Sequence, residues 1–563
     1  MDRIWLKHYP PGVPAEINPA EFPSLLHLVE HCIDRHRDRP CFTCMGRTLT
    51  YGDLDGLATR FAAFLQRVAR MRRGDRIAIM LPNVLQYPVA LVGALRAGLT
   101  IVNTNPMYTP RELQHQLHDS GARAILILEN FAHTLEAVRD DVDLDTVIVT
   151  GVGDLLGFPK SALVNFALRH VRKQVPEWSL PGAVRFDEAL SQGRYENLQP
   201  ATLGPDDIAF LQYTGGTTGV SKGAILTHRN LVANVLQAEA WVRSAIEDDA
   251  SVVAVTALPL YHIFALTANS FTMLKLGAHN VMIPNPRDFP GFVRVLAQYP
   301  FTFFAGVNTL FNALLHTPGF DTLDFSRLRV SLGGGMAVQR AVAEQWKRVT
   351  GSVLTQAWGL TETSPAATIN RPGDDFNGSI GLPISSTVVT IRDDAGNELP
   401  LGQSGEICVE GPQVMRGYWN RPDETEKVML PGQVLRTGDI GYMDPRGFVF
   451  IEDRKKDMIL VSGFNVYPNE VEGVAVTHPG VLEVAAVAQP DERAGEVVAL
   501  FVVRKDPSLT EEQLIEYCRG SLTGYKVPKR VYFRDELPKT NVGKILRRSL
   551  KDEIGVRPPS RQS

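Results

Sequence analysis

The sequence predicts an α/β fold, with a large N-terminal domain of layered sheets and a small α+β domain at the C-terminus. Two observations carry this prediction. Short apolar strands alternate with apolar runs at helical spacing from about residue 24 to 121, and again from 208 to 335. This alternation is typical of mostly parallel sheets covered by helices. A chain of 563 residues is also too long for one ordinary domain.

In the first alternation, "RIAIMLP" and "ARAILILEN" predict strands, and "YPVALVGALRAG" predicts a helix between them. From 387 to 451, short strands separated by Gly, Pro and Asp turns predict a small antiparallel subdomain. The polar stretch "DRKK" at 453–456 predicts the joint between a domain of residues 1–453 and one of residues 454–563. Beyond it, "VLEVAAVAQPDERAGEVVALFVV" predicts two strands, and "LTEEQLIEYCRGSL" predicts a helix with Thr510 as its N-cap.

Composition excludes several classes of protein. The net charge is -4 without a block of like charge, which argues against nucleic acid as a partner. Five cysteines in this length favour a reducing cytoplasm over a disulfide framework. Cys41 and Cys44 form a C-x-x-C without a second pair, and the H-x-x-E-H at 27–31 fits an ordinary amphipathic helix, so neither predicts a metal site. The first residues contain no apolar core for a signal peptide.

The most lipid-like window, residues 254–277, is interrupted by Pro259, His262, Asn269 and Lys275. These interruptions favour a buried element that lines a site over a membrane span.

The stretch "YTGGTTGVSKGA" follows the predicted strand "IAFLQY". Glycines there let backbone N–H groups face an anion, while hydroxyls and one ammonium add donors. The Walker pattern needs Gly directly before Lys, whereas Ser precedes it here, so a P-loop motor or GTPase fits poorly. A flexible surface loop is the alternative. The residues concerned are Thr214, Gly215, Gly216, Thr217, Thr218, Gly219, Ser221 and Lys222.

Four further motifs follow in order: "QAWGLTET", "TGD", "DRKKDMILVSGFNVYPNEVE" and "PKTNVGKILRR". The set resembles the adenylate-forming (AMP-binding) superfamily. Longer stretches such as "GPQVMRGYWNRP" and "LTGYKVPKRVYFRDELPKTNVGKILRR" resemble the bacterial long-chain fatty acyl-CoA synthetases over nearly the whole chain. The resemblance implies the adenylate-forming fold with a mobile C-terminal domain. It also implies that ATP, a fatty acid and CoA give acyl-CoA, AMP and pyrophosphate through an acyl-adenylate, feeding fatty acid β-oxidation.

The resemblance also implies residue roles. The loop at 214–222 would wrap the β- and γ-phosphates. Glu362 would bind Mg²⁺, for which a single carboxylate suffices beside phosphate and water, and Thr361 would donate to the α-phosphate. Asp439 would accept from the ribose hydroxyls, assisted by Arg454. The segments passing near adenine would supply Gly333, Gly334, Gly335, Trp358 and Gly359, with tryptophan where the family often has tyrosine.

Lys544 would bridge the incoming carboxylate and the α-phosphate oxygens, whereas Arg547 and Arg548 are interpreted as solvated helix charges. His262 has two readings, one beside the path of carboxylate and thiol and one as a buried, hydrogen-bonded histidine. Asp453 and Lys456 would form the hinge. The path for CoA would be lined by Ser462, Gly463 and Phe464.

Several alternatives stay open at this point. The substrate can be a medium-chain or other carboxylic acid, and a different class is a fatty-acid-binding or transport protein without catalysis. An amino acid substrate would need a buried carboxylate for its ammonium group, and "LPLYHIFAL" has none. The oligomeric state is open, a homodimer included.

The last expectation concerns location, in the cytoplasm and peripherally on the cytoplasmic membrane. Residues 160–175 place apolar side chains at i, i+4 spacing beside Lys160, Arg169, Arg172 and Lys173. This pattern predicts a basic amphipathic helix that can lie on an anionic membrane. Packing on its own domain is the alternative.

Overall fold

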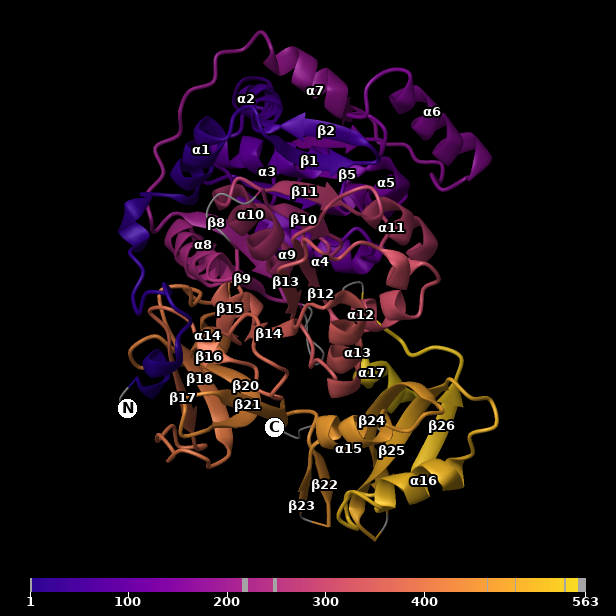
Figure 1. Ribbon diagram of the computed structural model, residues 1–563. Helices are drawn as coiled ribbons and strands as arrows, with labels where there is room; N and C mark the ends of the chain where they lie inside the picture. Colours follow the sequence, from indigo (N-terminus) through magenta and orange to yellow (C-terminus); the bar gives the residue numbers. More distant parts are fainter. Residues whose placement is uncertain are drawn as a thin grey trace.

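The computed structural model describes residues 3–214, 221–246, 251–462, 464–491, 493–540 and 543–554. Two large sheets and their helices make up the upper part of the molecule, above an antiparallel sheet and a separate C-terminal unit (Figure 1). The helices are α1 (Leu25–Arg35), α2 (Tyr51–Arg67), α3 (Gln86–Arg96), α4 (Pro110–Ser120), α5 (Ala132–Glu136), α6 (Lys160–Phe166), α7 (Phe186–Gly193), α8 (His228–Arg243), α9 (Ile263–Ala265), α10 (Thr272–Lys275), α11 (Phe289–Leu296), α12 (Asn308–Leu315), α13 (Arg340–Thr350), α14 (Pro422–Val428), α15 (Pro468–Ala475), α16 (Glu511–Arg519) and α17 (Arg547–Glu553).

The first large sheet is parallel except at one edge, where its last two strands form an antiparallel hairpin. Its core strands are buried along their whole length, as expected for a sheet covered by helices on both faces. In spatial order the strands are β7 (Val184–Arg185), β6 (Thr146–Thr150), β5 (Ala124–Leu128), β3 (Arg76–Met80), β4 (Thr100–Asn103), β8 (Ile208–Tyr213) and β9 (Gly223–Thr227).

The second large sheet is parallel through its centre and antiparallel at both ends. The carboxyl ends of its central strands lead to segments that carry several of the candidate site residues, as is common in open α/β sheets. The strands in order are β16 (Leu382–Pro383), β15 (Ala366–Ile369), β14 (Leu354–Gly359), β13 (Val330–Gly333), β12 (Phe303–Gly306), β10 (Val253–Thr256), β11 (His279–Met282), β1 (Pro40–Cys44) and β2 (Arg47–Thr50).

Two smaller sheets complete the fold. The third is antiparallel throughout, as the turn-rich stretch after 387 predicts. It contains β17 (Val388–Arg392), β18 (Gly405–Glu410), β19 (Met429–Leu430), β20 (Val434–Met443) and β21 (Val449–Arg454). The fourth belongs to the C-terminal unit and contains β22 (Ile459–Val461), β23 (Phe464–Val466), β24 (Val481–Asp491), β25 (Gly495–Arg504) and β26 (Arg530–Arg534).

Local signals place these elements well. β3, α3 and β5 lie where the apolar runs predict them, and β24 and β25 form the predicted antiparallel hairpin. Thr510 caps α16 by accepting from the backbone N–H of Gln513, as the sequence predicts. The lipid-like window 254–277 is a buried element, and among the described residues no helix is both long and apolar enough to cross a bilayer.

The predicted helix at 160–175 is wrong in one respect. A short α6 passes into a π-helical turn over Ala167–Val171, so its apolar side chains do not form one continuous face. Leu163 and Val171 are exposed, whereas Val164 and Leu168 are only partly so. Arg169 is not a free surface charge, because its Nη2 lies 2.5 Å from Oε2 of Glu129, a side chain that is 1% exposed. Arg169, one of the four basic residues predicted to face a membrane, is therefore paired within the protein.

Candidate active site

The phosphate-type loop connects the edge hairpin of the first sheet. β8 ends at Tyr213 and β9 begins at Gly223. The loop base is closed by the N–H of Thr214, which donates to the carbonyl of Lys222 at 2.9 Å, and by Ser221 Oγ, which donates to the carbonyl of Thr214 at 2.6 Å. Five of the predicted phosphate-binding residues lie outside the described residues, namely Gly215, Gly216, Thr217, Thr218 and Gly219.

Thr361 and Glu362 lie in the turn that follows β14. Oε1 of Glu362 accepts a hydrogen bond from the hydroxyl of Tyr418 at 2.6 Å, and its carbonyl accepts from the N–H of Met415 at 2.8 Å. Burial raises the pKa of Tyr418 first, and the Glu362 carboxylate raises it further. The phenol therefore stays protonated and orients the carboxylate.

Asp439 lies on β20 opposite Arg454 of β21, and its side chain is 1% exposed. Its Oδ2 accepts from the indole N–H of Trp358 at 2.9 Å. Its Oδ1 is 3.0 Å from Nε of Arg454, but no donor among the described residues forms a properly aligned hydrogen bond to it. A buried carboxylate oxygen with open acceptor capacity suits a ligand hydroxyl. The fold thus brings Asp439, Arg454 and Trp358 together.

The C-terminal loop that carries Lys544 contacts the large domain. Thr309 Oγ1 donates to the carbonyl of Gly543 at 3.2 Å. Gly543 has φ of +82°, and a Cβ there would lie 2.7 Å from Thr309 Oγ1, so this close approach requires glycine. The turn is closed by the N–H of Thr540, which donates to the carbonyl of Lys544 at 2.7 Å. A Cβ built on Gly335 would lie 3.7 Å from Cε of Lys544, so the lysine reaches the glycine segment after β13.

The surroundings of Lys544 lower its pKa. Burial lowers the pKa of Lys544 to about 8, and the neighbouring Arg454 lowers it further, against the opposing charges of Asp439 and Glu362. His262 caps α9 by accepting from the N–H of Phe264 through Nδ1 at 3.3 Å. Burial, and then Lys544, lower the pKa of His262 to about 3, so its imidazole is neutral at physiological pH. The neutral ring can donate from Nε2, but its low pKa makes it a weak general base.

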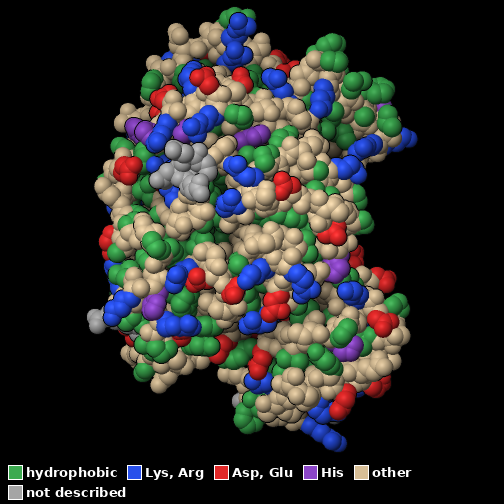
Figure 2. All heavy atoms as spheres, viewed as in Figure 1, with side chains coloured by type: hydrophobic (Ala, Val, Ile, Leu, Met, Phe, Trp, Pro, Cys, Tyr) green, Lys and Arg blue, Asp and Glu red, His purple; other side chains and the backbone are tan. Residues whose placement is uncertain are grey.

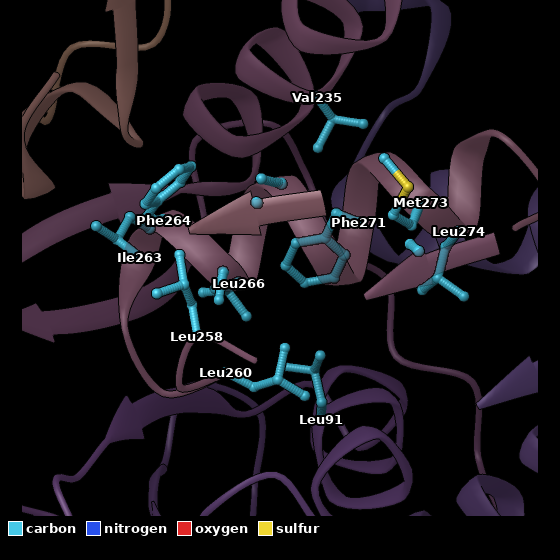
Figure 3. Close-up of a cluster of buried hydrophobic side chains, with 14 of the residues drawn as sticks. Leu91, Val235, Leu258, Leu260, Ile263, Phe264, Leu266, Phe271, Met273 and Leu274 are labelled. Atoms are coloured by element: carbon cyan, nitrogen blue, oxygen red, sulfur yellow. The ribbon is translucent and has the colours of Figure 1, made fainter. Parts of the chain in front are cut away.

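Ile263 and Phe264, which follow His262 in the chain, belong to a cluster of buried apolar side chains (Figure 3). The side chain of Phe264 approaches the glycine segment, because a Cβ on Gly334 would meet its ring at 3.0 Å. Gly333 ends β13, and Gly359 ends β14. The cluster beyond is fully or almost fully buried and includes Leu258, Leu260, Ile263, Leu266 and Phe271.

The predicted hinge residues lie at the end of β21. Asp453 is buried and accepts from the N–H of Asn469 at 2.9 Å, and burial raises its pKa to about 6. Burial lowers the pKa of Lys456. Of the predicted CoA residues, Ser462 and Phe464 are exposed in the hairpin of β22 and β23, with Phe464 57% exposed. Gly463 lies outside the described residues.

The interpretation of Arg547 as a solvated charge is wrong. Its guanidinium donates to both carboxylate oxygens of Glu472 at 2.9 Å and to Oδ1 of Asn469 at 2.9 Å. The Asn469 backbone in turn binds Asp453. Arg547 therefore connects the Lys544 segment to the residues next to the joint, a connection that helix spacing alone does not reveal.

Two side chains with contacts to the site are given no role by the motifs. Tyr418 binds Glu362, and Glu424 pairs with Lys222. Tyr418 belongs to "GPQVMRGYWNRP", which supports only the resemblance to the family, and Glu424 lies two residues beyond that stretch. The contacts of the Tyr418 phenol with Glu362 and of the Glu424 carboxylate with Lys222 are visible only in the folded structure.

The donor set for a metal is small. Among the described residues, no group of three or more His, Cys, Asp or Glu side chains is placed to hold an ion. Glu362 offers a single carboxylate, connected through Tyr418 to Lys222 at the end of the phosphate-type loop. That set does not suit zinc, which takes several protein ligands, but it suits Mg²⁺, which keeps waters and takes one or two carboxylates with substrate phosphates.

Comparisons with known proteins agree with this geometry. Residues 29–419 match the family model "AMP-binding enzyme", and residues 470–544 match "AMP-binding enzyme C-terminal domain". A long-chain-fatty-acid–CoA ligase of Escherichia coli O6:H1 is 56% identical over 98% of this chain and 98% of its own. One of Haemophilus influenzae is 50% identical over 99% and 100%.

The fold is also similar to a solved structure, an anthranilate CoA ligase in complex with anthranoyl-AMP. The TM-score is 0.84 at 24% identity, and the match covers 96% of this chain and 99% of that one. At this identity the likeness supports the fold alone. Together, the family models, the near full-length relatives and the shared architecture mean that the chain belongs to the AMP-binding enzyme family and has the adenylate-forming fold.

Proposed function

We propose that the chain is a long-chain fatty acid–CoA ligase that forms AMP, with Lys544 as the residue that joins its two anionic substrates. The observation that supports this proposal is the docking of the Lys544 turn on Thr309, with Cε of Lys544 near Gly335 and its charge acting on His262 and Asp439. Near full-length relatives at 50–56% identity are named as long-chain-fatty-acid–CoA ligases.

The first step joins a fatty carboxylate oxygen to the α-phosphorus of ATP and breaks the bond to the β-phosphate, so pyrophosphate leaves. Both reactants are anions, so the site must supply positive charge and donors. Lys544 bridges the carboxylate and the α-phosphate, and Thr361 donates to the same phosphate. Asp439 and Arg454 hold the ribose, and Lys222 holds the terminal phosphates. Fixed positions for both anions remove much of the entropic barrier.

Mg²⁺ has a place in this scheme. Glu362, oriented by Tyr418, would hold the ion together with phosphate oxygens and water. When bound, the ion would neutralise charge on the phosphates.

In the second step the CoA sulfur attacks the acyl carbon, and AMP leaves. The segment assigned to CoA, with Ser462 and Phe464, is exposed while Lys544 is docked. One orientation of the C-terminal unit therefore serves one step, and the second step requires it to turn at Asp453–Lys456. This turn would divide the chain into a large domain of residues 1–453 and a mobile domain of residues 454–563.

The acyl chain requires apolar surroundings. The cluster from Leu258 to Phe271, next to His262, offers them without a charged side chain in that stretch. A long unbranched acid fits such a lining, whereas the ammonium of an amino acid would be left unpaired.

Pyrophosphate release tests the function directly. The full chain, ATP and magnesium are incubated with saturated fatty acids from short to very long, with and without CoA. We expect pyrophosphate with long-chain acids, and acyl-CoA only when CoA is present. A binding or transport protein would release none. A maximum at medium-chain acids would replace the long-chain assignment.

We also propose that the protein binds peripherally to an anionic membrane, through exposed residues around α6 that differ in part from those expected from the sequence. The patch around α6 exposes Phe158 (90%), Leu163 (65%), Phe166 (59%) and Val171 (70%). Figure 2 shows hydrophobic and basic side chains together on the projection that is α6 in Figure 1. Exposed apolar groups beside Arg172 and Lys173 suit an anionic lipid surface. Such contact would bring the ligase to substrates that partition into bilayers.

A further inference from the structure

The ammonium of Lys222 is already paired. It contacts the Glu424 carboxylate, and the two side chains are 30% and 26% exposed. Glu424 lies in the first turn of α14, and its other oxygen is 2.5 Å from Nζ of Lys427. Hydrogen bonding to Lys222, and then to Lys427, lowers the pKa of Glu424 to about 2. The carboxylate is therefore charged throughout the physiological range.

Backbone pairing holds this contact in place. The N–H of Trp419 donates to the carbonyl of Gly223 at 2.8 Å, and the N–H of Ile225 donates to the carbonyl of Gly417 at 2.9 Å. The segment that leads to Glu424 is thus bonded to the strand that directly follows Lys222. The pair does not depend on two free side chains meeting in solvent.

Tyr418 connects the pair to the candidate metal ligand. Nζ of Lys222 lies 5.0 Å from the centre of the Tyr418 ring, and the hydroxyl of the same residue donates to Glu362 at 2.6 Å. An ammonium over an aromatic face is held without a full counter-charge. Lys222 can therefore turn between Glu424 and an incoming anion while keeping its contact with the ring.

We infer that Glu424 is a positioning residue that occupies the Lys222 ammonium when no phosphate is bound and competes with phosphate for it. The inference rests on the proposed role of Lys222 in holding the terminal phosphates. A carboxylate and a phosphate oxygen accept from the same ammonium hydrogens, so each phosphate that binds must displace Glu424. The competition weakens ATP and pyrophosphate alike. It favours the loss of pyrophosphate, which has no adenosine to keep it bound.

Glu424→Gln keeps the size of the side chain and removes the charge. Because a partly exposed pair is weak, we expect pyrophosphate to bind about two- to fivefold more tightly, measured by calorimetric titration of pyrophosphate into the full chain. The KM for ATP should fall by a similar factor. Loss of a merely structural contact would lower the melting temperature without tightening pyrophosphate.

Three further variants sharpen the test. Glu426→Gln changes an exposed glutamate of the same helix and should leave pyrophosphate binding unchanged. Glu424→Asp keeps the charge, so its affinity for pyrophosphate should stay close to that of the wild type. In a Lys222→Ala background, Glu424→Gln should have no effect, because the two changes act through one contact.

The outcomes separate cleanly. Unchanged or weaker pyrophosphate binding in Glu424→Gln, or an effect that persists without Lys222, overturns the role of Glu424 while leaving the ligase function intact. A wild-type chain that forms no pyrophosphate from ATP and fatty acid overturns both.

Discussion

Two segments of the C-terminal unit differ in how the structure uses them. The Lys544 turn contacts the large domain through Gly543 and Thr309, and it touches the glycine segment at Gly335. The hairpin of β22 and β23 buries one face in the C-terminal unit and exposes the other, with Leu460 at 48% and Phe464 at 57%. The Phe464 ring stacks on Tyr525 of the same unit at a centroid distance of 4.9 Å, so its aromatic contact lies within the C-terminal unit and not with the large domain. This contrast supports the proposal that the observed orientation serves adenylation, whereas the other step requires the hairpin to move to the site.

The largest expected effect is on adenylation, the half-reaction assigned to the Lys544 turn. Lys544→Ala should reduce acyl-AMP formation about 10²–10³-fold, because it removes the charge that bridges two anions. CoA attack on acyl-AMP supplied ready-made should be spared. Pyrophosphate release measures the first step, and acyl-CoA formation measures the second. Equal loss in both half-reactions would mean that Lys544 does not act in adenylation alone.

Lys456→Pro tests whether the unit turns between the steps. The neighbouring N–H groups of Lys455 and Asp457 donate to the carbonyls of Gly438 and Arg454, so residue 456 lies between anchored positions. Proline restricts φ there. We expect adenylation near the wild-type rate and thioester formation lowered on the order of 10²-fold, the cost of a misplaced catalytic segment. Wild-type rates for both steps would remove the hinge from the mechanism.

The pH dependence offers a finer comparison of the steps. The pKa of Lys544 is lowered to about 8 in the folded chain, by burial first and then by Arg454. The active form is the cation, which is present below this pKa and lost as pH rises through it. Adenylation kcat/KM should therefore fall roughly tenfold per pH unit above about 8. Thioester formation from supplied acyl-AMP should not show this decrease at high pH. If both steps show it, the decrease comes from the titration of a group other than Lys544.

The smallest expected effect concerns the other exposed apolar surface, the patch around α6. Arg172→Glu with Lys173→Glu should weaken sedimentation with phosphatidylglycerol vesicles, because each surface cation contributes on the order of 1 kcal/mol. Phe158→Ser with Phe166→Ser should weaken it further, and high salt should weaken the wild type. Arg169 is left unchanged because it pairs with Glu129.

Tyr517→Ser is the matched control for this patch. It removes an exposed aromatic side chain of α16, 39% exposed, in the C-terminal unit. Sedimentation should then equal that of the wild type. If the α6 variants also sediment like the wild type, this patch is not the membrane contact.

Residue spacing and type are enough to predict much of the local structure and to name most of the candidate groups. Alternating apolar runs predict β3, α3 and β5, and the Thr510 cap predicts the start of α16. These features depend on neighbours within a few residues, so spacing and residue type suffice. The resemblance of the motifs to the family also predicts roles for Asp439, Glu362 and Lys544, each of which requires a particular charge.

The pairing of charges, in contrast, depends on contacts between residues that are far apart in the chain. Arg169 lies 40 residues from Glu129, Tyr418 lies 56 from Glu362, and Lys222 lies 202 from Glu424. No periodicity relates such positions, because strand register and helix packing bring the segments together. The same reason explains Arg547, which the helix pattern leaves in solvent and which the fold binds to Glu472. A charge is read from the sequence, but its partner is set by the fold.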